Sequence, residues 1–597
     1  MSSVYKVAGP ALLVLTGSAL LEAALTSGCY GTSGVDVGTD GSPADGNGPT
    51  GTTSATTTGT TTGTTTTTTG TTTSTTTGTS TGTEAGATTG VEAGTTTGAE
   101  AGPTTGNDAG QTTGVEGGTT TGTGANINSG AGPWGTPVAG GGPTPSGTTV
   151  TGTVTVNRST IQGAVGTGFA GFSFEKTHIT NSSLTGTNAP LIALYKLIGP
   201  TVLRLGANDV DRCTWDPTAQ PGAGGPPYTF NIGTAMVDEL AAFLTASGAR
   251  IIYGVNYHSD NVPNTAAEAT YAQTKLGSSA YGFEIGNEID KYGAWSALQA
   301  QWESFATAIL AGAPAASLIG PAATGGSSSS LTVPFAEAES AKFADKLVLL
   351  TQHYYTGSAG TSGATVATLQ IPKSDIASIT TTVSGAAVKY NIPDGYRFGE
   401  CNTFSGHGQM GVSDTLISGL WGLDLMFLNA EHGSSGVNFH GGETGMDGTK
   451  PFYYEPIMEN NGVVQTVMPV YYGMLLFYLA GQGQVLGTTV VSSDADFTAH
   501  SLDYKTDGST SVVLDNKSAA TGVQVTVNAG MAVTSASAIY LQGAPANSLT
   551  AASVTLAGAE VSATGVWKRN PPYAQTISGN TVSVYVPPAS AALVRIQ

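Results

Sequence analysis

Short apolar, β-branched runs alternate with longer helical patterns eight times between residues 165 and 483. A parallel strand needs a long crossover before the next strand can pair with it, and a helix is the usual crossover. Eight such units are enough to close a parallel sheet on itself. We therefore predict an α/β fold, a (β/α)8 barrel (TIM barrel) over residues 159–483, with strands at 168–175, 201–206, 250–256, 281–288, 317–322, 346–355, 396–402 and 436–442.

The pattern changes at residue 484. Residues 484–597 contain short alternating runs such as VQVTVNAG and TVSVYVPP, separated by Gly, Asn and Pro. Such runs are typical of an antiparallel β-sandwich. The strand-like segment 149–158, TVTGTVTVNR, is expected to join this sandwich although it precedes the barrel.

Residues 1–29 contain an apolar stretch that Gly and Pro interrupt and that ends in LTSGC. Because a bilayer span needs about 20 uninterrupted apolar residues, a signal peptide fits better than a membrane helix. The small residue before Cys29 favours a lipoprotein cleavage site with lipid attachment at that cysteine, and a plain cleaved signal is the alternative. We predict an exported protein, either a cell-surface lipoprotein of the outer membrane or a secreted one.

Residues 30–148 form a Thr/Gly-rich tract in which five octads, beginning at Glu84, each carry one acidic residue. A repeat without large apolar residues cannot bury a face against its neighbour, so this tract is predicted to be a disordered linker.

The whole chain has a net charge of −20 and a pI near 4.6. This charge argues against nucleic acid and anionic membranes as partners, because nothing would neutralise their phosphates. The predicted contact with a membrane is through the lipid anchor alone. If Cys29 carries lipid, Cys213 and Cys401 remain, and the sequence does not decide whether they pair, nor the oligomeric state.

Two glutamates stand at the ends of predicted barrel strands. Glu288 ends the fourth strand in GFEIGNE, and Glu400 ends the seventh in RFGECNT. Barrel enzymes keep their active sites at this end of the strands, and the fourth and seventh strands lie across the mouth from each other. One carboxyl group could protonate a glycosidic oxygen while the other attacks the anomeric carbon. A structural ion pair is the alternative for either glutamate.

The motifs FSFEKTHIT, LRLGANDVDRCTW, GFEIGNEID, RFGECNT and GVNFHGG occur in this order over about residues 150–597. In order and spacing they resemble glycoside hydrolase family 79, which contains β-glucuronidases and heparanase. The resemblance implies Glu288 as acid/base, Glu400 as nucleophile and Asn287 as a ligand of the sugar 2-hydroxyl. The chain departs from the family pattern at Ala207 and Asp209.

Further candidates for substrate binding follow other strands. Tyr354 is expected to orient Glu400, while Glu175 and Asn208 face the same mouth and could bind hydroxyl groups. A rim aromatic and two helix caps are the alternatives for these three. In the family that the chain resembles, the C6 carboxylate of the sugar is bound by residues that follow the nucleophile and the eighth strand. Here the resemblance implies Gly406, Gly408, Gln409, His440 and Tyr454. The Gly-rich loop could equally be a flexible rim.

Two GxGxxG segments, 166–171 and 406–411, match a dinucleotide-binding fingerprint. The first precedes its strand, and the residues CNTFS stand between Glu400 of the seventh strand and the second, so neither has the context of that motif. A GxSxG at 78–82 lies in the Thr/Gly tract. The sequence has no HExxH or paired CxxC, and we predict neither a metal nor another cofactor.

These features predict a hydrolase, a retaining, exo-acting β-glucuronidase-like glycosidase whose substrate is a carbohydrate with a terminal uronic acid. The alternatives are a retaining β-glycosidase for a neutral hexoside or xyloside, a catalytically inactive carbohydrate-binding surface lipoprotein, and an oxidoreductase that uses the segment 406–411. The natural aglycone and endo action stay open.

Overall fold

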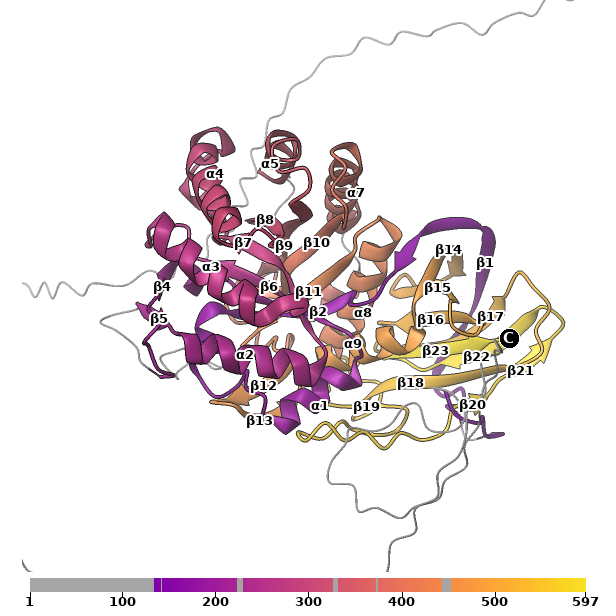
Figure 1. Cartoon of the computed structure of the whole chain (residues 1–597). Helices are drawn as coiled ribbons and strands as arrows, with labels where there is room; N and C mark the ends of the chain where they lie inside the picture. Colours follow the sequence, from indigo (N-terminus) through magenta and orange to yellow (C-terminus); the bar gives the residue numbers. More distant parts are fainter. Residues whose placement is uncertain (1–133, 141, 223–228, 326–330, 372–373, 443–451) are drawn as a thin grey trace, which may run out of the picture. The chain divides into compact units, whose positions relative to one another are not determined.

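The computed structural model describes residues 134–140, 142–222, 229–325, 331–371, 374–442 and 452–597. The predicted signal peptide, Cys29 and the acidic octads lie outside these ranges. The described residues form a barrel and a large β-sheet (Figure 1).

Eight parallel strands close into the barrel, as the alternating pattern predicted. Around the barrel they follow the order β10 (Tyr396–Ser405), β11 (Gly436–Gly441), β2 (Ala170–Glu175), β3 (Val202–Gly206), β6 (Arg250–Val255), β7 (Ala280–Ile285), β8 (Leu318–Ala323) and β9 (Leu347–Ser358). Each overlaps its predicted range. The strands are buried on both faces, which is why they are near-continuous apolar runs in the sequence.

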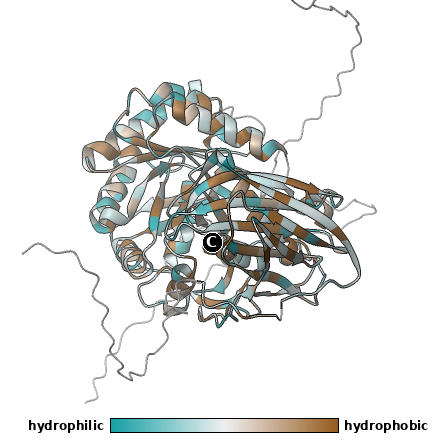
Figure 2. Cartoon of the chain, turned by 90° about the vertical axis from the view of Figure 1, so that its right-hand side faces the viewer, coloured by the Kyte–Doolittle hydropathy of each residue, from teal (hydrophilic) through white to brown (hydrophobic). Residues whose placement is uncertain are grey.

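Helices surround the barrel, namely α1 (Ala189–Leu197), α2 (Thr234–Ser247), α3 (Val262–Leu276), α4 (Trp295–Gly312), α5 (Thr332–Glu339), α6 (Val366–Gln370), α7 (Ser374–Lys389), α8 (Leu416–Glu431) and α9 (Pro469–Ala480). Local chemistry sets their ends. The side chain of Asn261 accepts a hydrogen bond from the Asn264 N–H and so caps α3, while Gly248 ends α2 with a φ of 78°. Helices and strands in Figure 2 carry both hydrophobic and hydrophilic residues.

The second part is an eleven-stranded, mostly antiparallel sheet. Its strands are β1 (Thr148–Val165), β14 (Gly483–Ser492), β15 (Phe497–Tyr504), β16 (Thr510–Asn516), β17 (Thr521–Asn528), β18 (Ala536–Ala544), β19 (Ser553–Leu556), β20 (Tyr573–Ala574), β21 (Thr576–Ser578), β22 (Thr581–Val586) and β23 (Ser590–Ile596). β1 contains the segment 149–158 and pairs antiparallel with β14 but parallel with β17. The sheet folds over a core that includes Val154, Val512, Val525 and Val584.

Contacts of the sheet begin before residue 149. The Trp134 indole N–H donates to Ser537 Oγ at 2.6 Å, and the Val138 N–H donates to the Pro572 carbonyl at 2.9 Å. The range predicted as linker, 30–148, therefore extends too far toward the C-terminus. The prediction was based on the Gly- and Thr-rich composition of this range, in which a single tryptophan, Trp134, has little weight.

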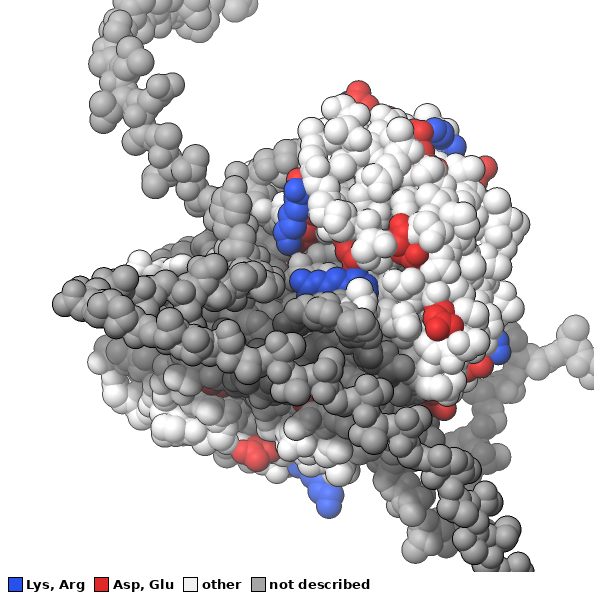
Figure 3. All heavy atoms as spheres, turned by 90° about the vertical axis from the view of Figure 1, so that its left-hand side faces the viewer, with Lys and Arg blue, Asp and Glu red and all other residues white. Residues whose placement is uncertain are grey.

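Charged side chains are sparse on the barrel face in Figure 3, where isolated acidic and basic groups stand among uncharged residues. Cys213 and Cys401 are both buried and both free, so they do not form a disulfide. Within the described ranges, no helix combines the length and apolar character needed to cross a membrane.

Candidate active site

The two glutamates reach the barrel mouth in different ways. Glu400 lies within β10, whereas β7 ends at Ile285 and Glu288 stands in the turn after it. Gly286 and Glu288 have φ values of 81° and 47°, a left-handed turn that costs energy for a residue with a side chain. The Glu288 N–H donates to the Ala322 carbonyl at 2.7 Å, which holds the turn against β8.

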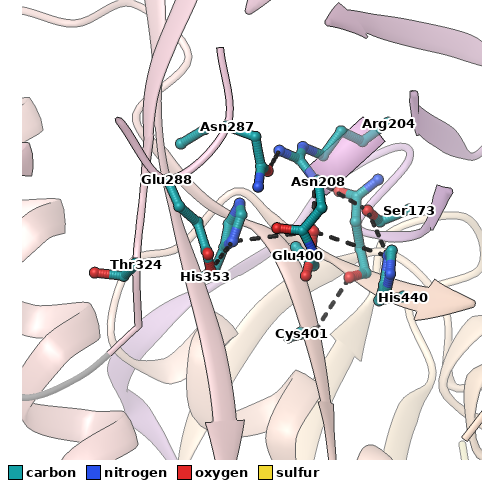
Figure 4. Close-up of polar contacts among 12 residues, drawn as sticks. Ser173, Arg204, Asn208, Asn287, Glu288, Thr324, His353, Glu400, Cys401 and His440 are labelled. Atoms are coloured by element: carbon teal, nitrogen blue, oxygen red, sulfur yellow. Dashed lines mark hydrogen bonds and ion pairs between the residues drawn. The ribbon is translucent and has the colours of Figure 1, made fainter. Parts of the chain in front are cut away.

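Arg204 of β3 is the centre of the polar network below the mouth (Figure 4). Its guanidinium is fully buried and donates to Glu284 Oε2 at 2.6 Å, to Glu400 Oε2 at 2.8 Å and to Asn287 Oδ1 at 2.7 Å. Ser173 Oγ accepts a longer bond of 3.3 Å. A planar guanidinium has five donors in a rigid fork, so a single side chain fixes the positions of four acceptors from β2, β7, β10 and the turn after β7.

The second oxygen of Glu400 is bound from β9. Tyr355 donates its phenol to Glu400 Oε1 at 2.7 Å, while Nδ1 of His353 and of His440 lie 3.9 and 3.8 Å from Glu400 Oε2. Burial raises the pKa of Glu400, but the charges of the two histidines and Arg204 and the Tyr355 hydrogen bond together hold it below its usual range. Burial also lowers the pKa of His440, so the charge of this ring contributes less at neutral pH. The arrangement suits an ionised nucleophile.

His353 lies between the two glutamates (Figure 4). Its Nδ1 is 3.0 Å from Glu288 Oε1 and 3.9 Å from Glu400 Oε2, so these carboxylate oxygens are at most about 7 Å apart. This limit is below most of the range used by inverting glycosidases, which leave room for a water molecule between the carboxyl groups.

Lys291 contacts the other oxygen of Glu288. Burial raises the pKa of Glu288, but the His353 hydrogen bond and charge and the Lys291 ammonium outweigh burial and lower it. A lowered pKa keeps the Glu288 carboxyl group ionised at neutral pH. An ionised Glu288 suits a general base, and it needs a proton before it can act as an acid.

The mouth also contains Asn287, Asn208 and Glu175. The Asn287 oxygen accepts from Arg204, and its NH2 group has no acceptor among the described residues, so it can donate to a bound molecule. Asn208 is exposed and accepts from Lys291 Nζ at 3.3 Å. Glu175 accepts from the Asp209 N–H at 2.8 Å, and burial together with the Asp209 charge raises its pKa well above the usual range. Glu175 can therefore be a hydrogen-bond donor.

The prediction for Tyr354 chose the wrong tyrosine. The Tyr354 phenol donates to Asp375 Oδ1 at 3.1 Å, on the helical side of β9, and its ring stacks on Phe398. Successive residues of a strand point to opposite faces, so the neighbours His353 and Tyr355 face the barrel interior. Tyr355 takes the position expected for Tyr354.

The residues predicted around a C6 group lie together. The Tyr454 ring is 6.1 Å from that of Tyr355 and 6.0 Å from that of His440. Gly408, with a φ of 80°, packs so closely that an added Cβ would lie 2.9 Å from the Tyr454 nitrogen. The sequence requires glycine there for both reasons.

The donors of the 406–409 loop are only partly available. The Gln409 N–H already donates to Ser413 Oγ at 2.8 Å, and its side-chain oxygen accepts from the Gly360 N–H at 2.9 Å. The N–H groups of Gly406 and Gly408 have no acceptor among the described residues.

Four residues of the site were not among the predicted candidates: Ser173, Arg204, His353 and Tyr355. Their only sequence signal was a polar side chain inside an apolar strand, as in LRLG and TQHYY. Such a residue is costly to bury without a partner, so the pattern marks a polar cluster but not its members' partners.

The other sequence motifs do not form a second functional site among the described residues. The 406–411 segment follows β10, and α8 begins only at Leu416, so no helix N-terminus adjoins its glycines. The segment 78–82 lies outside the described residues. Among the described residues, no three His, Cys, Asp or Glu side chains are grouped to hold a metal ion.

A cavity of about 1040 Å³ lies at the opposite, amino-terminal end of the strands. Residues such as Thr201, Arg250 and Tyr281 line it, and neither catalytic candidate is among them. In barrel enzymes this end contributes stability, so the carboxylates at the mouth define the candidate site.

The sequence matches no family model and no curated protein. Solved structures do resemble it. A 4-O-α-L-rhamnosyl-β-D-glucuronidase from Fusarium oxysporum is 22% identical with a TM-score of 0.60, over 74% of this chain and 99% of that one. A family 51 arabinofuranosidase from Xanthomonas axonopodis is 16% identical with a TM-score of 0.53, over 75% and 100%.

A bifunctional glucanase-xylanase from a metagenome library is 13% identical with a TM-score of 0.53, over 75% of this chain and 99% of that one. At these identities the likeness shows the fold. The chain has the barrel-and-sheet architecture found in these glycoside hydrolases.

Proposed function

We propose that this protein is a retaining β-glycosidase that removes a terminal uronic acid. The observation that carries the proposal is the pair of carboxylates on β10 and after β7, which share His353 and lie at most about 7 Å apart. Glu400 is held ionised by Arg204 and Tyr355, as a nucleophile must be.

In the first step, the Glu400 carboxylate attacks the anomeric carbon and the bond to the glycosidic oxygen breaks. Glu288, in its protonated form, gives its proton to that oxygen, so the leaving group departs as an alcohol. The Asn287 NH2 group, fixed through Arg204, is placed to bind a hydroxyl group of the sugar.

In the second step, Glu288 is a carboxylate and takes a proton from water. The resulting hydroxide attacks the anomeric carbon, and the ester bond to Glu400 breaks. Two inversions give net retention. The contacts of Glu288 with His353 and Lys291 favour this ionised form, so the first step is expected to be fastest at acidic pH.

Three features support a uronate at the reacting position. His440 lies 3.8 Å from Glu400, the Tyr454 ring contacts the rings of His440 and Tyr355, and Gly408 packs against the Tyr454 backbone. We infer that the Tyr454 phenol, His440 and the N–H groups of Gly406 and Gly408 donate to the substrate carboxylate. The family 79 motifs and a solved neighbour described as a β-D-glucuronidase point the same way.

A neutral hexoside or xyloside is the second candidate. The Gln409 N–H already donates to Ser413 Oγ, so the proposed carboxylate site has one donor fewer. Glu175, whose Oε1 lies 4.0 Å from His440 Nε2, can bind a neutral hydroxyl group as well as a carboxylate.

The deciding experiment compares an aryl β-glucuronide with the matching aryl β-glucoside. We expect the glucuronide to be hydrolysed far faster, with the β-anomer as first product by NMR. Glu400→Gln should abolish turnover. Tyr454→Phe should lower kcat/KM for the glucuronide about 10-fold or more, the effect of a lost hydrogen bond to a charged group. Equal rates on both substrates would favour the neutral sugar, and an α-anomer would rule out retention.

The proposal includes export through the predicted signal peptide, with lipid attachment at Cys29. It is supported by the apolar stretch and by the small residue that precedes this cysteine. Mass spectrometry of the mature N-terminus should find a diacylglycerol-modified Cys29, and an unmodified N-terminus would exclude the anchor.

A further inference from the structure

Tyr292 combines exposure with a fixed position. It is the only aromatic residue among the exposed large hydrophobic side chains of the described ranges, at 42% exposure. Its ring stacks on His258 with centroids 4.3 Å apart and planes 6° apart. Its phenol donates to Asp211 Oδ2 at 3.1 Å, and Asp211 is itself held by the Tyr257 N–H at 2.9 Å. A side chain fixed in this way loses little entropy when a ligand binds.

This ring belongs to the side of the mouth where the acid stands. The short helix Ile289–Tyr292 begins directly after Glu288, and Lys291 of the same turn contacts the Glu288 carboxylate. A glycosidic oxygen receives its proton from the acid, so the departing group must lie next to Glu288. Since Tyr292 ends the turn that follows the acid, we assign it to the leaving-group side.

Polar groups lie near the ring. Lys291 directly precedes Tyr292 and donates to Asn208 at 3.3 Å, while Arg212, 44% exposed, is close enough for its charge to act on the Tyr292 phenol. An aromatic surface flanked by a few amide and cationic donors matches a sugar, which has an apolar C–H face and a rim of hydroxyl groups.

We propose that Tyr292, stacked on His258, is the platform that binds the leaving-group sugar, with Asn208, Lys291 and Arg212 as donors to its hydroxyl groups. The inference rests on the proposed function and extends it: the natural substrate has a pyranose, and not a small alcohol, on the leaving side of the cleaved bond.

The test uses two substrates that differ only in the leaving group. One is a disaccharide in which β-glucuronic acid is linked to a hexose, and the other is the matching glycosyl fluoride, whose leaving group has no ring and needs no acid. Tyr292→Ala should lower kcat/KM for the disaccharide about 10-fold, as expected for loss of one stacking contact, and leave the fluoride unchanged.

Two variants control for indirect effects. Tyr292→Phe keeps the ring and should retain most activity on the disaccharide. Tyr390→Ala removes a half-buried tyrosine that lies just beyond α7, before β10, and should affect neither substrate.

An equal loss on both substrates for Tyr292→Ala would overturn the inference, because it would show an effect through Glu400 or folding. An unchanged disaccharide rate would overturn it as well. If the wild-type chain hydrolyses neither substrate, the proposed function fails, and the platform falls with it.

Discussion

Arg204 forms ion pairs with two glutamates at once. It is fully buried between Glu284 and Glu400, both of which accept charge-assisted hydrogen bonds from it. The Thr351 hydroxyl donates to the other carboxylate oxygen of Glu284, Oε1, at 2.7 Å. Removal of this cation would leave both buried carboxyl groups without their charged partner, at a cost of about 3–5 kcal/mol.

Lys291 should determine the highest pH at which the enzyme stays active. Its ammonium contacts Glu288 and lowers the pKa of that carboxyl group. In Lys291→Met the pKa of Glu288 should rise, so the protonated acid persists to higher pH. We expect the basic limb of the kcat/KM profile on an aryl glycoside to move upward by up to about one pH unit, because an exposed ion pair contributes little more.

Lys275→Met is the matched control for this measurement. Lys275 is 40% exposed, against 43% for Lys291, and pairs with Asp238 at 3.0 Å on the outside of the barrel. Its pH profile should equal that of the wild type. An unmoved or lowered basic limb in Lys291→Met would contradict the assignment of Glu288 as the acid.

At the scale of elements, β9 shows how a strand divides its side chains. His353 and Tyr355 face the barrel interior, while Tyr354 between them contacts Asp375 of α7. β9 and β10 pair with an irregularity between Phe398 and Glu400, which brings Glu400 level with His353. One shifted residue in this register is enough to change which tyrosine meets the nucleophile.

The two adjacent tyrosines give a paired test of this arrangement. Tyr355→Phe removes the phenol that binds Glu400 Oε1, so kcat/KM should fall about 10-fold or more. Tyr354→Phe should leave kcat/KM within about twofold and lower the free energy of unfolding by about 0.5–1.5 kcal/mol. Steady-state kinetics and urea unfolding measure the two effects. The reverse pattern would show that Tyr354 faces the site.

At the scale of the whole molecule, a buried charge cluster joins the barrel to the sheet. Asp424 of α8 accepts from Lys517 Nζ at 2.6 Å and lies 3.0 Å from Nε2 of His500 on β15. His500 Nδ1 is 2.6 Å from Glu431, at the end of α8. These contacts fix the sheet against one barrel helix through charges that must stay paired.

His500 should make this connection sensitive to alkaline pH. Burial lowers its pKa, but the charges and hydrogen bonds of Glu431 and Asp424 outweigh burial and raise it to about 10. A raised folded-state pKa adds stability that is complete below the unfolded value of about 6.5 and is lost as pH rises through the folded value. The stabilising effect should therefore decline between about pH 6.5 and 10.

Urea unfolding of the wild type and of His500→Gln over this pH range measures the effect. The difference in unfolding free energy should be a few kcal/mol near pH 6 and shrink toward pH 10. His432→Gln is the control, because that ring contacts the Thr381 hydroxyl and, among the described residues, no carboxylate. A difference that does not change with pH would show that His500 is not charged in the folded protein.

Local patterns in the sequence were enough for the barrel and for its two carboxylates. Strand and helix periodicity depend on neighbouring residues, and Glu288 and Glu400 follow from their places in the fourth and seventh βα units. The antiparallel character of the second domain followed from its alternation, but the parallel pairing of β1 with β17 did not. That pairing joins residues more than 360 positions apart.

What the tertiary structure decided is which side chains meet. Arg204 binds groups from β7, β10 and the turn after β7, and no local pattern encodes those separations. In a strand buried on both faces, apolar residues occupy both sides, so the pattern does not show which way a given residue points. The sequence therefore could not tell Tyr354 from Tyr355. The sequence by itself determined the fold class and the two carboxylates, because both are local. The partners that set their charges come from distant strands and exist only once the barrel closes.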